Sequence, residues 1–173
     1  MTRTGTVSPF PSCAARRRGA HRAPEVRTLH LVDLENLMGT VRTAEDVAGV
    51  WSGYTATLRL DRSDHVVVGT GPALAATAWF VLPAGGLRRV VGRGLNGGDR
   101  ALLEVAADTS LVARAYQRLV IASGDGIFTG LAARYRAAGL EVVQVVGRGR
   151  PHPALTAQCD RQLSLPARLA LAV

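Results

Sequence analysis

The chain has 173 residues, enough for one domain with a full core, and 47% of them are hydrophobic, which excludes a wholly disordered protein. All 21 basic residues are arginine, so mechanisms that need a lysine are excluded. No apolar run reaches the ~20 residues of a membrane span, and no apolar core of a signal peptide is found. The two cysteines, Cys13 and Cys159, lie far apart and match no metal spacing. We therefore expect a cytoplasmic protein that does not enter a membrane.

The formal net charge of +8 is concentrated near the N-terminus. Residues 1–27 contain six arginines and one acid, Glu25. We expect residues 1–26 to form a basic, disordered arm and residues 27–173 to form a single domain. The arm is either a solvated tail or a contact for an anionic partner, most simply nucleic acid, which it would bind by counterion release.

The pattern of strands and helices becomes regular from residue 27 onward. Thr43 followed by Asp46 is a helix-capping signal, and Pro72 stands at a favoured first-turn position. In chain order we expect strand 27–33, helix 43–60, strand 65–71, helix 72–82, strand 88–92, helix 99–107, strand 119–123, helix 127–138, strand 141–147 and a short final helix in 165–173.

Strands that alternate with helices of ten or more residues imply βαβ units and a parallel sheet. The strands are nearly continuous Val, Ile and Leu runs, which is typical of strands covered on both faces. We therefore predict an α/β three-layer sandwich with a mainly parallel sheet of about five strands and helices on both faces, without internal repeats.

Three aspartates follow apolar strands: Asp33, Asp99 and Asp125. Ligands of open α/β sheets bind at the carboxyl ends of the strands, where these acids are expected to meet. Taken singly, Asp99 and Asp125 are typical helix caps, whereas a buried Asp33 needs a partner or a metal. Together, three carboxylates repel one another unless a cation lies between them, and oxygen ligands select Mg²⁺ or Mn²⁺. Such a metal can activate water and stabilise an in-line phosphoryl displacement.

The stretches LHLVDLENL, NGGDRALLE and VIASGDGIFTGLAARYRAAGLEVVQVV resemble the NYN domain, a branch of the PIN-like metal-dependent ribonuclease superfamily. The resemblance covers about residues 27–150. One departure is Ile127, where many relatives carry a further aspartate. The family's three motifs, an Asp-x-x-Asn, a Gly-x-Asp and a Ser-Gly-Asp, correspond here to Asp33 with Asn36, Gly97-Gly98-Asp99 and Ser123-Gly124-Asp125.

The resemblance implies a Rossmann-like, PIN-like fold and a Mg²⁺- or Mn²⁺-dependent endoribonuclease with RNA as its partner. A homo-oligomer is left open. The residues implied as metal ligands are Asp33, Asp99 and Asp125, with Glu104 as a fourth acid. Asn36 joins the three aspartates in the catalytic set, and the substrate contacts expected are Ser123, Arg88, Arg93 and Arg148.

Three other interpretations stay open. Gly92, Gly94 and Gly97 form a GxGxxG dinucleotide pattern, but after the third strand and beside Asp99, which would repel a pyrophosphate. The Asp33-x-Glu35 pair resembles haloacid-dehalogenase-type phosphatases, which need a lysine. A PIN-like module that binds RNA without cutting it agrees with Ile127 and the basic arm, and the 5% aromatic content argues against binding by base stacking.

Overall fold

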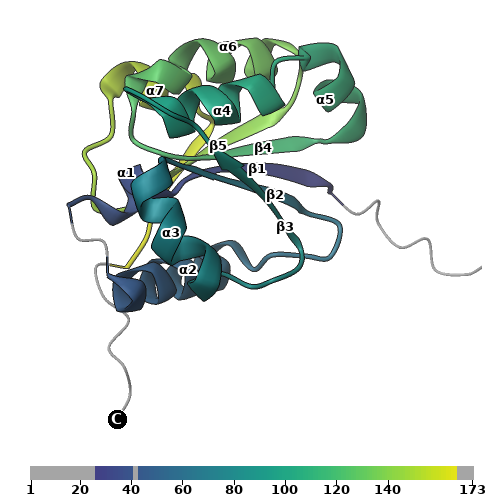
Figure 1. Cartoon of the computed structure of the whole chain (residues 1–173). Helices are drawn as coiled ribbons and strands as arrows, with labels where there is room; N and C mark the ends of the chain where they lie inside the picture. Colours follow the sequence, from purple (N-terminus) through teal and green to yellow (C-terminus); the bar gives the residue numbers. More distant parts are fainter. Residues whose placement is uncertain (1–25, 41–42, 167–173) are drawn as a thin grey trace, which may run out of the picture.

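The computed structural model describes residues 26–40 and 43–166. The predicted arm, apart from Val26, and the predicted final helix, apart from Leu165 and Pro166, lie outside these residues. In the described part, six strands form one sheet (Figure 1). The strands are β1 (Thr28–Asp33), β2 (His65–Thr70), β3 (Leu87–Val91), β4 (Arg118–Ala122), β5 (Glu141–Val146) and β6 (Arg161–Ser164).

All neighbouring strands are parallel, in the order β3-β2-β1-β4-β5-β6. This arrangement confirms the predicted α/β fold with a parallel, Rossmann-like sheet. The sixth strand, β6, was not predicted. Three of its four residues are exposed at the edge of the sheet, so it lacks the apolar run by which the five other strands were found.

Helices cover both faces of the sheet, as the three-layer prediction requires (Figure 1). Helices α2 and α3 lie on one face, and α4, α5, α6 and α7 lie on the other. The short helices α1, α5 and α7 were not predicted, because five to seven residues give too little apolar periodicity. The helices are α1 (Leu34–Met38), α2 (Ala44–Leu58), α3 (Pro72–Val81), α4 (Gly97–Val105), α5 (Thr109–Ala115), α6 (Thr129–Ala137) and α7 (Pro153–Gln158), with a 3-10 turn, η1 (Gly126–Phe128), before α6.

Two apolar cores hold the layers together. Alternate side chains of β1 point to opposite faces, so Leu29 and Leu31 pack under α4 and α6 while Val32 packs under α2 and α3. The largest fully buried side chains include Tyr135 and Phe128 in the first core and Tyr54 in the second. None of the helices in the described part of the chain is both long and apolar enough to cross a membrane.

The helix-capping signal at the start of α2 is confirmed. The Thr43 hydroxyl accepts a hydrogen bond from the Asp46 backbone N–H at 3.2 Å and donates one to the Asp46 carboxylate at 2.6 Å. We expect Thr43→Ala to lower the free energy of unfolding by about 1 kcal/mol, since one backbone N–H of the first turn loses its partner. Denaturant unfolding measures the change, and Thr43→Ser, which keeps the hydroxyl, should restore most of the loss. Equal losses in the two variants would contradict the capping role.

The connections that leave β1 and β4 go to opposite faces of the sheet. After β1 the chain continues into α1 and α2 on one face, and after β4 it continues into η1 and α6 on the other. Because β1 and β4 are neighbours, the carboxyl ends of these two strands form a switch point, the place where open α/β sheets typically bind ligands. Asp33 and the Ser123-Gly124-Asp125 segment lie at this switch point.

Candidate functional site

The structure brings the carboxyl groups of Asp33 and Asp99 within hydrogen-bonding reach of each other. Asp33 is the last residue of β1, and Asp99 lies in the first turn of α4, which packs on β2 and β1. Both side chains are buried, with 5% of Asp33 and 9% of Asp99 exposed. Two residues that are 66 positions apart in the chain therefore share one small, poorly hydrated space.

The shared space changes the acidity of both carboxyl groups. Burial, followed by the charge of Asp99, raises the pKa of Asp33 to about 8, against an ordinary value of 3.8. Burial also raises the pKa of Asp99, and the charges of Asp125 and Glu35 add to that rise. Without a cation, the pair therefore retains a proton near neutral pH, whereas the same carboxyl groups exposed to water would both be ionised. A divalent cation would replace this proton, and an all-oxygen donor pair fits Mg²⁺ or Mn²⁺.

Asp125 lies near the pair but turns toward its own backbone. Its carboxylate accepts a hydrogen bond from the Ile127 N–H at 2.9 Å and so caps η1. Its charge reaches Asp99, yet across residues 26–40 and 43–166 no three His, Cys, Asp or Glu side chains are grouped closely enough to hold one ion. Asp33 and Asp99 thus form the close pair, and Asp125 contributes negative charge beside it.

Hydrogen bonds through Ser123 fix the orientation of Asp33. The buried Ser123 hydroxyl donates to Asp33 Oδ2 at 2.9 Å and accepts from the Asp125 N–H at 3.0 Å. The other carboxylate oxygen, Asp33 Oδ1, accepts from the Asn36 N–H at 3.1 Å. We expected Ser123 to contact substrate, but the structure places it inside the protein, where it links the ends of β1 and β4.

Asn36 makes a second link between the ends of these strands. Its side-chain Oδ1 accepts a hydrogen bond from the Gly124 N–H at 2.7 Å. Gly124 is required here because a Cβ at this position would lie 2.5 Å from the Arg150 carbonyl oxygen, in the segment that follows β5. Asn36 therefore positions the loop that carries Asp125.

Glu104 and Glu35 occupy different places from those that the sequence suggested. Glu104 is exposed on α4, and it is not among the groups that shift the pKa of Asp33 or Asp99. Glu35, two residues after Asp33, does act on Asp99. We did not propose Glu35 as a ligand. Its position between the Asp33 and Asn36 of the first motif is the signal that could have identified it.

The arginines expected to bind substrate are divided between the carboxyl ends and the amino ends of the strands. Arg93 follows β3 and Arg148 follows β5, so both lie at the carboxyl edge with Asp33. Arg93 is exposed, and Arg148 is 3.2 Å from the Asp46 carboxylate. Arg88 is the second residue of β3 and lies toward the amino edge, away from the acids.

The glycine-rich segment after β3 has a packing explanation. A Cβ at Gly92 would lie 1.7 Å from the Gly97 carbonyl oxygen, so the two ends of the loop touch through their backbones. The chain after β1, where a dinucleotide fingerprint normally lies, reads Leu34-Glu35-Asn36 and has no glycine turn. The loop therefore serves to start α4 and to place Asp99.

Comparison with known proteins gives a likeness in fold. No protein-family model matches the chain, and no curated protein matches it. Among solved structures, the chain is similar to a protein of unknown function from Vibrio parahaemolyticus, with a TM-score of 0.59 and 15% sequence identity over 82% of this chain and 94% of that chain. At this identity the likeness supports the α/β architecture alone.

Proposed function

We propose that the protein is a metal-dependent ribonuclease of the NYN/PIN-like type, which hydrolyses phosphodiester bonds of RNA. The observation that carries the proposal is the buried Asp33–Asp99 pair at the carboxyl edge of β1, with Asp125 and Glu35 adding negative charge. A buried pair of acids costs stability unless a cation joins it, which favours a binding role over a purely structural one. The parallel sheet order and the three sequence motifs agree with the family resemblance.

Each residue at this edge has a role in the proposed reaction. Asp33 and Asp99 would hold Mg²⁺ or Mn²⁺, which supplies water activation and charge stabilisation for phosphoryl transfer. Ser123 and Asn36 keep Asp33 and the Asp125 loop in place through the hydrogen bonds described above. Arg93 and Arg148 lie at the same edge and can neutralise RNA phosphates, which makes binding salt-dependent.

Cleavage of labelled RNA by the purified full-length chain tests the proposal. We expect cleavage with Mn²⁺ or Mg²⁺, none with EDTA, and a loss of about 100-fold or more in Asp99→Asn, because one ligand of the reactive metal is removed. Asp125→Asn should reduce the rate less, since Asp125 lies outside the close pair. Glu45→Gln, an exposed change of the same kind on α2, serves as the matched control and should keep the wild-type rate.

A second candidate function is RNA binding without cleavage. It is favoured by the use of the Asp125 carboxylate as a cap and by Ile127, which packs against the core under α6 instead of supplying an acid. If the wild-type chain cleaves no RNA of the panel with any metal but binds RNA in a salt-sensitive manner, this function replaces the nuclease. The same gel and filter-binding samples measure both quantities.

A further inference from the structure

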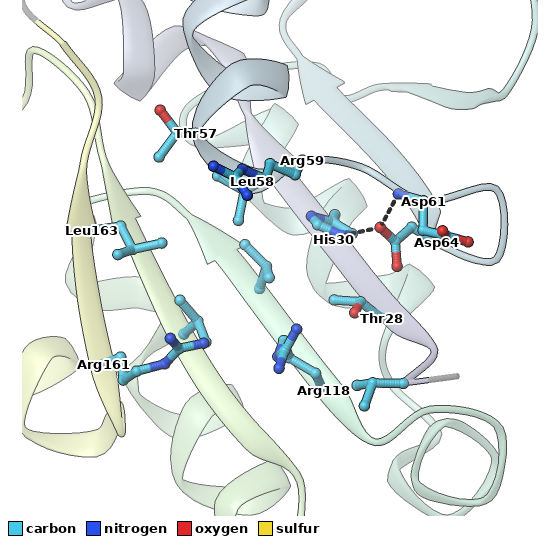
Figure 2. A pocket seen from close by; sticks show the side chains of 13 residues that line it. Thr28, His30, Thr57, Leu58, Arg59, Asp61, Asp64, Arg118, Arg161 and Leu163 are labelled. Atoms are coloured by element: carbon cyan, nitrogen blue, oxygen red, sulfur yellow. Dashed lines mark hydrogen bonds and ion pairs between the residues drawn. The ribbon is translucent and has the colours of Figure 1, made fainter. Parts of the chain in front are cut away.

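A pocket of about 360 Å³ lies at the amino edge of the sheet, opposite the edge that carries Asp33 (Figure 2). It is bounded by the first residues of β1, β4 and β6 and by the C-terminal end of α2. It therefore faces the side of the sheet that α2 and α3 cover. None of the residues assigned to the proposed ribonuclease site lines it.

Two arginines form one wall of the pocket. Arg118 begins β4 and Arg161 begins β6, and Glu141 at the start of β5 lies between them. The Glu141 carboxylate accepts from Arg118 Nε at 2.7 Å and pairs with Arg161 Nη2 at 2.8 Å. A guanidinium has five N–H donors, so each arginine keeps most of its donors for another anion. Glu141 also holds both guanidinium groups in place before any ligand arrives.

A third cation, Arg59, lies at the end of α2. It takes the left-handed conformation of a helix C-cap, with φ of 49°, and its side chain is exposed at the pocket (Figure 2). Within residues 26–40 and 43–166 its guanidinium has no hydrogen bond or ion pair. Three arginines from three separate elements thus border one pocket, which Asp61 and Asp64 also line, while Glu141 pairs with Arg118 and Arg161.

The floor between the arginines is apolar. Leu163 on β6 and Leu58 on α2 supply its accessible apolar surface, and Val143 on β5, only 1% exposed, lies beneath them. The acidic residue Asp64 lies at the other end, where its carboxylate accepts from the Asp61 N–H at 2.8 Å and is 3.6 Å from His30 Nε2 (Figure 2). Only 9% of the Asp64 side chain is exposed, and its carboxylate contacts His30 and the Asp61 backbone N–H.

We propose that this pocket binds a small organic acid, with its carboxylate on Arg118 and Arg161 and a short apolar chain on Leu58 and Leu163. Guanidinium groups recognise a carboxylate through paired hydrogen bonds, and the volume is in the range of small-molecule sites. The apolar floor distinguishes this ligand class from inorganic anions, which would gain nothing from it. The proposal is independent of the ribonuclease function, because it uses the other edge of the sheet.

Titration of the full-length chain with acetate, butyrate, hexanoate and inorganic phosphate tests the proposal. Methyl-detected NMR monitors each titration. We expect affinity to rise from acetate to hexanoate, with saturable shifts of the Val143, Leu163 and Leu58 methyl resonances. Arg161→Ala should weaken hexanoate binding by about tenfold, the effect of losing one charge-assisted contact. Arg134→Ala, which removes the same charge from an exposed position on α6, is the matched control and should bind as wild type.

A second variant, outside β6, separates a loss of binding from a folding defect that Arg161→Ala could cause in that strand. Arg59→Asn suits the left-handed cap and removes the third cation, so it should weaken binding while leaving the thermal midpoint unchanged. The proposal is overturned if hexanoate causes no saturable shift in these methyl groups. It is also overturned if phosphate binds as tightly as hexanoate, or if Arg134→Ala weakens binding as much as Arg161→Ala does.

Discussion

Asp33→Asn is expected to abolish cleavage and, in metal-free buffer, to remove a loss of stability that the wild-type chain undergoes as the pH rises to about 8. The pKa of Asp33 is raised to about 8 in the folded protein, against 3.8 for an ordinary carboxyl. Between these values the unfolded state has lost the proton and the folded state keeps it, so the free energy of unfolding falls as pH rises. Above about pH 8 both states are ionised and the fall ends.

The window from pH 6.5 to pH 8 isolates this effect. Burial lowers the pKa of His30 to about 4 from 6.5, so His30 makes stability rise with pH below 6.5 and opposes Asp33 there. At pH 6.5 the unfolded-state histidine is still half protonated, and about one pH unit higher it is neutral in both states, so it opposes Asp33 only weakly within the window. A single retained proton changes stability by at most about 1.4 kcal/mol per pH unit, so wild type should lose about 1 to 2 kcal/mol across the window.

Urea denaturation at several pH values, with EDTA present, measures this loss. The Asp33→Asn variant should give a nearly flat profile from pH 6.5 to pH 8, because the amide does not titrate. Asp108→Asn is the control: Asp108 is exposed, and its pKa is lowered by hydrogen bonds, first of all from the Leu111 N–H, so its titration lies far below the window. A wild-type profile as flat as that of Asp33→Asn would show that the buried pair holds no extra proton.

Gly92→Ala is expected to lower the free energy of unfolding by about 3 kcal/mol, a large effect for one methyl group. The added Cβ would lie 1.7 Å from the Gly97 carbonyl oxygen and 2.1 Å from its carbon, and backbone atoms cannot rotate away as a side chain can. Relief requires a shift of the turn that starts α4. Since Asp99 is in the first turn of that helix, the cleavage rate should fall in the protein that still folds.

The matched control for this variant is Gly85→Ala in the loop before β3. No atom lies within 4 Å of a Cβ at Gly85, and its backbone does not adopt a positive φ. Its stability should change by no more than about 0.5 kcal/mol, as for other open surface sites. Chemical denaturation and the RNA assay, run on both variants, separate a loss of stability from a displacement of Asp99 at the start of α4. Equal stability of the two variants would contradict the close backbone contact.

The fold was largely predictable because most strands carry a strong local signal. The runs around Val67 and Ile121 are continuous and apolar, and the run around Val143 is interrupted only by the buried Gln144; such runs mark strands that are covered on both faces. The edge strand β6 gave no such signal, because Arg161 and Gln162 face solvent. The seven residues of α5, opened by the Asp108 cap, were too few for a helical period to stand out.

The candidate site was predictable only in part, for a different physical reason. Asp33 could be placed at a strand end, since strand ends follow from the apolar pattern. Whether Ser123 faces substrate or Asp33 depends on a hydrogen bond between residues 90 positions apart, and no local pattern encodes it. The position of Arg88 depends on where β3 begins, and the amino-edge pocket depends on the packing of α2 against four strands.

The strand order also bears on how the site comes into being during folding. β1 and β4 are neighbours, yet β2 and β3 and five helices separate them in the chain. Parallel pairing of such distant segments is slow, because a long loop must close before any contact forms. Asp33 and Asp99 lie in the part that is synthesised first, whereas Ser123, which orients Asp33, follows β4. Activity should therefore develop late in refolding, together with the docking of β4, and can serve as a kinetic reporter of that step.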